Sequence, residues 1–107
     1  MKINKSKLFI IAHTLVRVYK ITLSEALKIS WKNMKLKISL HEGGAHFQYL
    51  KKDGTLRETF GTLHNIEHLL VGSDKFQNDK LTFRYYDLEK KEFRSFKMVN
   101  LISVEQF

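Results

Sequence analysis

The chain has 107 residues, with 19 Lys and Arg against 11 Asp and Glu, and a formal net charge of +8 at pH 7. This length predicts one domain, residues 1–107, and 43% hydrophobic residues are enough for a core. The chain has no cysteine and no apolar run as long as a membrane span, which excludes disulfides, thiolate chemistry and a transmembrane helix. No secretory signal is evident at the basic start, so we expect a cytoplasmic protein.

The positive charge is concentrated in the N-terminal part of the chain. Residues 1–40 carry nine Lys and Arg and a single acid, Glu25, whereas residues 41–107 carry ten basic and ten acidic residues. Such a split is typical of a chain whose basic part contacts a polyanion or an acidic protein surface. The alternative interpretation is that the charge only keeps a small protein soluble.

A first helix is predicted over Lys7–Tyr19. Apolar residues recur there at spacings of three and four, and they form one stripe of Leu8, Ile11, Leu15 and Val18. We expect this stripe to face the rest of the molecule.

A second helix is predicted from Thr22 to Met34, because Thr22 and Glu25 fit a capping box. Its buried side is expected to hold apolar and small residues at helical spacing: Leu23, Ala26, Leu27, Ser30, Trp31 and Met34. The opposite face carries Lys28, Lys32 and Lys35, whose like charges repel one another. Residues 35–40 alternate between polar and apolar, and this pattern predicts either a strand or a linker.

A first β-hairpin is predicted around Asp53-Gly54, with strands over Ala45–Lys52 and Thr55–Thr62. A two-residue turn would place Tyr49 opposite Glu58 and Phe47 opposite Phe60. Because side chains alternate along a strand, the core face is expected to hold Ala45, Phe47, Tyr49, Leu56 and Phe60. The outer face is then expected to hold His46, Gln48, Lys52, Arg57 and Thr59.

A second hairpin is predicted over Lys80–Leu88 and Glu92–Asn100, after a long connection at residues 63–79 with one helical turn around Ile66–Leu70. A two-residue turn near Lys90-Lys91 would pair Asp87 with Arg94, and a salt bridge is the expected role of Arg94. Leu101–Val104 supplies a final strand. The predicted fold class is therefore α+β: two N-terminal helices followed by a small antiparallel β-barrel, since closure of a barrel removes exposed edges.

Three sequence segments resemble a family of small phage and bacterial proteins with an SH3-like (Sm-like) β-barrel related to WYL domains. Ser24–Trp31 resembles the family's SEALKxAW helix, Lys51–Leu63 its KKDGTxRxxxGTL hairpin, and Tyr86–Ile102 its FRSFxxxNLI hairpin. The resemblance implies this barrel with helices leading into it, a phage or prophage origin and a bacterial host cell. It implies no reaction, and the chain lacks a Trp-Tyr-Leu tripeptide, so ligand sensing of the WYL kind is not expected.

The histidines are the candidates for chemistry. His64 and His68 stand at i, i+4, which suits a zinc pair, but no third ligand is evident nearby. His41 and His46, together with Lys51 or Lys52, have the residue types of an acid–base pair for cleaving RNA. Because the five histidines are scattered, we expect no catalytic residue, no metal and no cofactor.

Binding residues are better supported by the sequence than catalytic ones. Cations interleaved with aromatics suit RNA or single-stranded DNA, where phosphates take the charge and bases stack. Phe47, Phe60, Phe83, Tyr85 and Phe96 are expected to be core instead. The predicted contact residues are Arg17, Lys20, Lys28, Lys32, Lys35, Lys37, Lys52, Arg57, Arg84 and Lys97.

Three functions of different classes remain. The first is a non-catalytic binding protein that engages nucleic acid, with RNA favoured, or a ribonucleoprotein; one form is an anti-CRISPR inhibitor of an RNA-guided nuclease. The second is a DNA-binding transcriptional regulator with Thr22–Met34 as its recognition helix. The third is a small histidine-dependent ribonuclease. The sequence predicts no oligomeric state.

Overall fold

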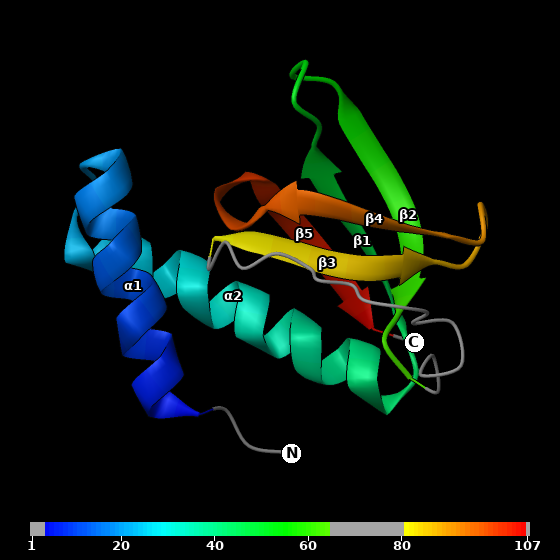
Figure 1. Ribbon diagram of the computed structural model, residues 1–107, viewed down its shortest axis with the longest axis horizontal. Helices are drawn as coiled ribbons and strands as arrows, with labels where there is room; N and C mark the ends of the chain where they lie inside the picture. The colour runs from blue at the N-terminus through cyan, green and yellow to red at the C-terminus, as the bar shows by residue number, and fades with distance from the viewer. Residues whose placement is uncertain (1–3, 65–80, 107) are drawn as a thin grey trace, which may run out of the picture.

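The computed structural model describes residues 4–64 and 81–106 (Figure 1). The predicted order of two helices followed by antiparallel strands is confirmed. The elements are α1 (Lys5–Tyr19), α2 (Leu23–Glu42), β1 (Ala45–Leu50), β2 (Leu56–Thr62), β3 (Thr82–Asp87), β4 (Glu92–Lys97), the 3₁₀ helix η2 (Met98–Asn100) and β5 (Leu101–Gln106). The helical turn predicted around Ile66–Leu70 lies outside the described residues. Within the described residues, neither helix combines the length and the apolar character that a bilayer crossing requires.

Helix α1 begins at an Asn4 cap, whose side chain accepts a hydrogen bond from the backbone N–H of Lys7 (3.1 Å). Its buried residues are Leu8, Ala12 and Leu15, and Tyr19 continues this line against the second helix. Val18 is 53% exposed, so its placement on the buried stripe is wrong. The buried line steps by four, three and four residues, and Val18 falls about 100° away from it around the helix.

Helix α2 has the predicted capping box, in which Glu25 N–H donates to the Thr22 hydroxyl and the Glu25 carboxylate accepts from Thr22 N–H. The helix continues to Glu42, which resolves the choice between strand and linker for residues 35–40: they are helical. Leu36 and Leu40 are separated by one helical turn and are both fully buried against the sheet. The alternating pattern therefore reflects a helix whose polar and apolar residues interleave.

The face that α2 buries differs from the predicted one. Trp31 is 46% exposed and Leu23 is 42% exposed, so the prediction that they are buried is wrong. The contact with α1 is made by small residues instead, since Ala26 and Ser30 are fully buried. The Ser30 hydroxyl donates to the carbonyl of Leu8 on α1 (2.9 Å). Close approach at these small side chains leaves Trp31, the next residue along the helix, on the solvent side.

The strands form one antiparallel sheet in the order β4-β3-β2-β1-β5. In Figure 1, α2 runs along one side of this sheet and α1 crosses the first half of α2. The main core lies between the sheet and α2, and it includes Phe47, Tyr49, Phe83, Tyr85 and Phe96. A smaller cluster of Ala12, Leu15, Ala26 and Leu81 joins the two helices to the start of β3.

The register of the first hairpin differs from the prediction by one residue. Phe47 pairs with Thr59 and Tyr49 with Arg57, not with Phe60 and Glu58. The turn has three residues, 52–54, because the backbone N–H of Lys51 donates to the carbonyl of Thr55 (2.8 Å). A three-residue turn of this kind needs a left-handed residue at its end.

A shift of one residue exchanges the two faces of β2. Thr59 is 1% exposed and lies on the core side, whereas Leu56 (53% exposed) and Phe60 (37% exposed) lie on the outer side. The predictions that Leu56 and Phe60 are core and that Thr59 is outward are therefore wrong. The prediction that Arg57 lies on the outer face is also wrong, because Arg57 pairs with Tyr49 and lies on the same face of the sheet. The outer ring of Phe60 instead contacts His46, with 4.6 Å between ring centroids.

The register of the second hairpin differs by two residues. Phe83 pairs with Phe96 and Asp87 with Glu92, across a turn of residues 88–91. Because a shift of two keeps every side chain on its predicted face, Phe83, Tyr85 and Phe96 are buried as expected. The expected salt bridge is confirmed on the diagonal, with Arg94 Nε 3.0 Å from Asp87 Oδ2.

Candidate functional site

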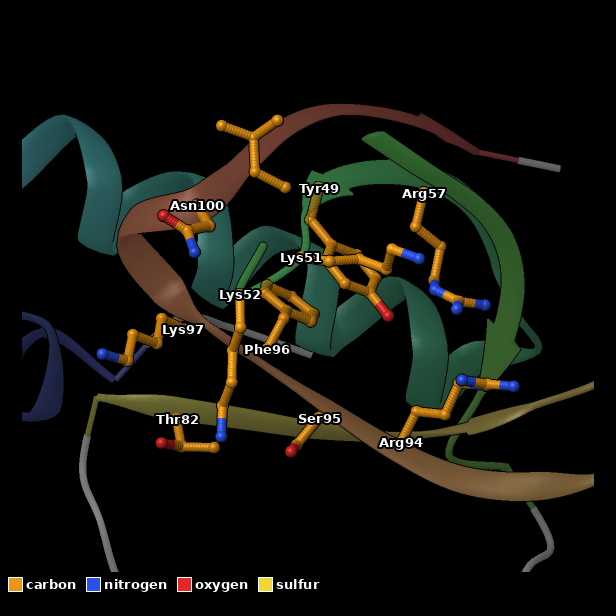
Figure 2. Close-up of a pocket in the computed structure, with 11 residues that line it drawn as sticks. Tyr49, Lys51, Lys52, Arg57, Thr82, Arg94, Ser95, Phe96, Lys97 and Asn100 are labelled. Carbon is orange, nitrogen blue, oxygen red and sulfur yellow. The ribbon is translucent and has the colours of Figure 1, made fainter. Parts of the chain in front are cut away.

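A pocket of about 520 Å³ opens between the β1–β2 loop, the edge strand β4 and η2 (Figure 2). Figure 2 shows Asn100 and Lys97 at one end, Arg57 and Arg94 at the other, and the rings of Tyr49 and Phe96 between them. We call this the basic pocket. It is lined by Tyr49, Leu50, Lys51, Lys52, Arg57, Thr82, Arg94, Ser95, Phe96, Lys97 and Asn100.

The basic pocket concentrates positive charge. Five of its lining side chains are Lys or Arg, and none of the described lining residues is acidic. Within the described part of the chain, Arg94 is the one of these five that forms an ion pair; the others are Lys51, Lys52, Arg57 and Lys97. Like charges around a shared cavity raise the local potential and attract an anion.

The β1–β2 loop supplies two of the cations, and β2 supplies Arg57. Lys51 and Lys52 enter the turn, and Gly54 ends it with φ +87°, a left-handed conformation that glycine adopts without steric cost. Asp53, the acid of this loop, is turned toward Thr55: its carboxylate accepts from the Thr55 hydroxyl (2.6 Å) and N–H (3.0 Å). These hydrogen bonds lower the pKa of Asp53.

Strand β4 supplies Arg94, which two carboxylates hold in place. Its Nε lies 3.0 Å from Asp87 Oδ2, and its Nη2 donates to Glu92 Oε2 (2.6 Å). Burial alone would raise the pKa of Asp87. Hydrogen bonds from the N–H groups of Lys90 and Glu89 and from the Thr59 hydroxyl, together with the charge of Arg94, outweigh burial and lower it. Asp87 is thus an ionised anchor beneath Arg94.

The floor of the basic pocket is aromatic and well ordered by its neighbours. The rings of Tyr49 and Phe96 stack with 4.5 Å between centroids and a 17° interplanar angle. The Tyr49 and Tyr85 hydroxyls are hydrogen-bonded at 2.7 Å. Burial is the main cause that raises the pKa of Tyr85, and this hydrogen bond raises it further. The floor is thus formed by packed rings, and the charged groups of the pocket lie around it.

An aromatic floor beneath a cationic rim suits a ligand that combines a flat ring with negative charge. Lys and Arg side chains pair with phosphate oxygens, and Arg does so in a bidentate manner. Thr82, Ser95 and Asn100 add hydroxyl and amide groups that donate and accept hydrogen bonds. Nucleotides combine these features, with stacking bases, phosphates and sugar hydroxyls.

A comparison with known protein families identifies a family with this fold. The sequence profile of WYL_2, described as an Sm-like SH3 beta-barrel fold, matches residues 33–102, which is more than half of the chain. The chain belongs to the WYL_2 family. Searches of curated proteins and of solved structures found no match. The matched range holds every residue that lines the basic pocket of this WYL_2 protein, whereas α1 and the first part of α2 precede it.

Three of the predicted contact residues meet in the pocket of this WYL_2 protein: Lys52, Arg57 and Lys97. The structure does not bring the others there. Arg84 lies over the ring of Phe93 on the outer face of the second hairpin, 5.7 Å from its centroid. Exposed positions on α1, at its C-cap and on α2 hold Arg17, Lys20, Lys28, Lys32, Lys35 and Lys37.

Two of the helix lysines have particular surroundings. Lys32 Nζ donates to the carbonyl of Ile102 in β5 (3.2 Å), so its charge lies beside the C-terminal strand. Partial burial and the charge of Lys7 lower the pKa of Lys37. The α2 helix of this WYL_2 protein leads into β1, so within residues 4–64 no third helix supports it as a recognition helix would require.

The histidine candidates are not assembled into one site. His46 lies on the outer side of β1, with Nδ1 3.1 Å from Glu105 and Nε2 3.8 Å from Glu58, and it does not line the pocket that holds Lys51 and Lys52. His64 Nδ1 lies 3.0 Å from the carbonyl oxygen of His41. His68, the other half of the predicted zinc pair, lies outside the described residues. Among the described residues, no group of three or more His, Asp or Glu could hold a metal.

Sequence reasoning missed several lining residues of the basic pocket. The sequence points to Lys51 only beside the histidines, to Arg94 only as a salt-bridge partner and to Tyr49 only as a core residue. For Lys51 the signal is the Lys51-Lys52-Asp53-Gly54 run, whose glycine also permits a three-residue turn. Thr82, Ser95 and Asn100 carry no sequence signal, because they reach the pocket only through the placement of β3, β4 and η2 relative to the first hairpin.

Proposed function

We propose that this protein binds single-stranded nucleic acid, with RNA favoured, through the basic pocket, and that it does so without catalysis. The observation that carries the proposal is the convergence of five Lys and Arg side chains over the stacked rings of Tyr49 and Phe96. Phosphates would lie against the cations, and an unpaired base would enter the pocket above these two residues, of which Tyr49 is 3% and Phe96 5% exposed.

Several features of the pocket favour a single strand over a duplex. The pocket is a local concavity at the end of a hairpin, and a base must leave its stack to enter such a site. A duplex keeps its bases paired and presents only its phosphates. The hydroxyls of Thr82 and Ser95 and the amide of Asn100 favour RNA, since they suit the 2′-hydroxyl, which donates and accepts hydrogen bonds.

The test is the affinity of the full chain for a fluorescently labelled oligouridylate, measured by anisotropy at low salt. Arg57→Gln removes one unpaired cation of the pocket and leaves a shorter, neutral polar side chain. We expect it to weaken binding about tenfold, the loss typical of a charged hydrogen-bond contact. The same oligonucleotide in DNA form should bind more weakly.

Arg84→Gln is the matched control, because it removes the same charge from a neighbouring strand outside the pocket. It should bind RNA within about twofold of the unmodified chain, as expected for a charge away from the contact. Equal losses in both variants would mean that only net charge matters. Equal affinity of Arg57→Gln and the unmodified chain, or no binding of any single strand at low salt, would contradict the proposal.

A further inference from the structure

A second exposed surface lies on α2. Trp31 is 46% exposed, although it is the single tryptophan of the chain and one of its largest apolar side chains. Lys28 and Lys35 stand three residues before it and four after it, so both are its neighbours on the helix surface. Lys32 lies between them. We call Lys28, Trp31, Lys32 and Lys35 the α2 platform.

Helix α2 contacts the basic pocket region through η2, and Lys32 is the platform side chain that reaches it. Asn33 of α2 donates from Nδ2 to the carbonyl of Met98, the first residue of η2 (3.0 Å). Asn100, the last residue of η2, lines the pocket. Two residues further on, the carbonyl of Ile102 accepts from Lys32 Nζ (3.2 Å). Two residues of extended chain span about 7 Å, so the Lys32 ammonium lies near the Asn100 end of the pocket.

The charged residues of the two segments that form this connection are all basic. Residues 28–37 contain no Asp or Glu, and neither do residues 97–104. A strand that leaves the pocket past Lys97 and Asn100 therefore meets further cations and no carboxylate from these two segments. Grooves that bind single strands combine cations along the backbone path with aromatic rings on which successive bases stack.

We propose that the single-stranded RNA of the basic pocket continues over η2 onto the α2 platform, where a base stacks on Trp31. This inference rests on the proposed function, and it extends the contact from one pocket to a path. It also accounts for a large apolar ring left exposed among three lysines. The three lysines around Trp31 complement the phosphates of the same RNA strand, which is the occupant to which this inference commits.

The test compares oligouridylates of about four and about 12 nucleotides, which bracket the site sizes of single-strand binders. We expect the longer RNA to bind about tenfold more tightly and to quench the fluorescence of Trp31. The shorter RNA should bind in the pocket with the fluorescence unchanged. Trp31→Ala should remove the gain from length and leave the affinity for the short RNA as it was, and Trp31→Phe should restore part of the gain.

Leu23→Ala is the matched control, since Leu23 is an apolar residue on the same helix with 42% exposure. It should keep the full length dependence. Equal affinities of the two RNAs, or binding of the long RNA without a change in Trp31 fluorescence, would overturn the inference while the loss in Arg57→Gln still supports the pocket. If neither RNA binds, the proposed function fails and this inference fails with it.

Discussion

Asp87 connects the interior of the protein to its basic pocket. Its side chain is 2% exposed, yet its pKa is lowered, because backbone N–H groups, the Thr59 hydroxyl and Arg94 together outweigh the effect of burial. A buried carboxylate with this many partners stabilises the fold only while it is ionised. It also orients Arg94 at the wall of the pocket.

Asp87→Asn is therefore expected to lower the free energy of unfolding at neutral pH by about 2–3 kcal/mol, the range for hydrogen bonds to a charged group. The pKa of Asp87 in the folded chain lies below the ordinary value of 3.8. Its contribution is thus complete above that value and is lost as the pH falls through the lowered pKa. Urea unfolding at a series of pH values measures this.

The comparison between the two chains isolates Asp87 from the other carboxylates. The difference in unfolding free energy between the unmodified chain and Asp87→Asn should shrink as the pH falls below 3.8. A difference that stays constant in acid, or that is absent at neutral pH, would show that the ionised carboxylate does not stabilise the fold.

At the scale of elements, the three-residue turn of the first hairpin decides where Arg57 lies. The turn ends at Gly54 with φ +87°, and the pairing of Lys51 with Thr55 follows from it. A two-residue turn would shift the register by one residue and move Arg57 to the outer face. The left-handed conformation of Gly54 therefore places Arg57 in the pocket, where we propose that it contacts an RNA phosphate.

Gly54→Ala should lower the free energy of unfolding by about 1 kcal/mol, because alanine resists a positive φ. Gly54→Asn is the matched variant, since asparagine adopts this conformation at a smaller cost. Thermal denaturation of the three chains measures the order, which should be Gly, then Asn, then Ala. Equal stability of all three would mean that the turn changes conformation freely.

At the scale of the whole molecule, charge is distributed over two separate regions. Residues 1–40 carry the net charge of the chain, whereas the basic pocket lies within residues 41–107, whose net charge is zero. A local cluster of cations thus exists in a neutral part of the sequence, and no described residue that lines the pocket is acidic. Asp87 and Glu92 pair with Arg94, and Glu58 and Glu105 flank His46 on the outer face.

RNA binding should weaken steeply as salt increases, since phosphate contacts release counterions. For single strands the slope of log K against log salt is about −0.7 for each phosphate neutralised. Four contacts, one for each unpaired cation of the pocket, predict a slope of about −3 for a short oligouridylate. Arg57→Gln should reduce its magnitude by about 0.7. Binding that does not depend on salt would contradict a phosphate contact.

Much of this protein followed from local sequence patterns. The helical spacing of α1, the capping box at Thr22, the two hairpins and the final strand were predicted from periodicity and turn residues alone. The faces of the second hairpin were predicted correctly even with the wrong partners, because an even shift in register preserves alternation. The asymmetry of charge is a property of the sequence alone.

The basic pocket and the α2 platform depended on tertiary structure. Periodicity determines which residues share a face, but the length of a turn and the size of the packed side chains decide which face is buried. One added turn residue brought Arg57 to the core side with Tyr49, and small residues at Ala26 and Ser30 left Trp31 exposed. The physical reason is that a periodic pattern shows which residues share a face of a helix or strand. Contacts between segments distant in the sequence decide which of these faces turns toward the core.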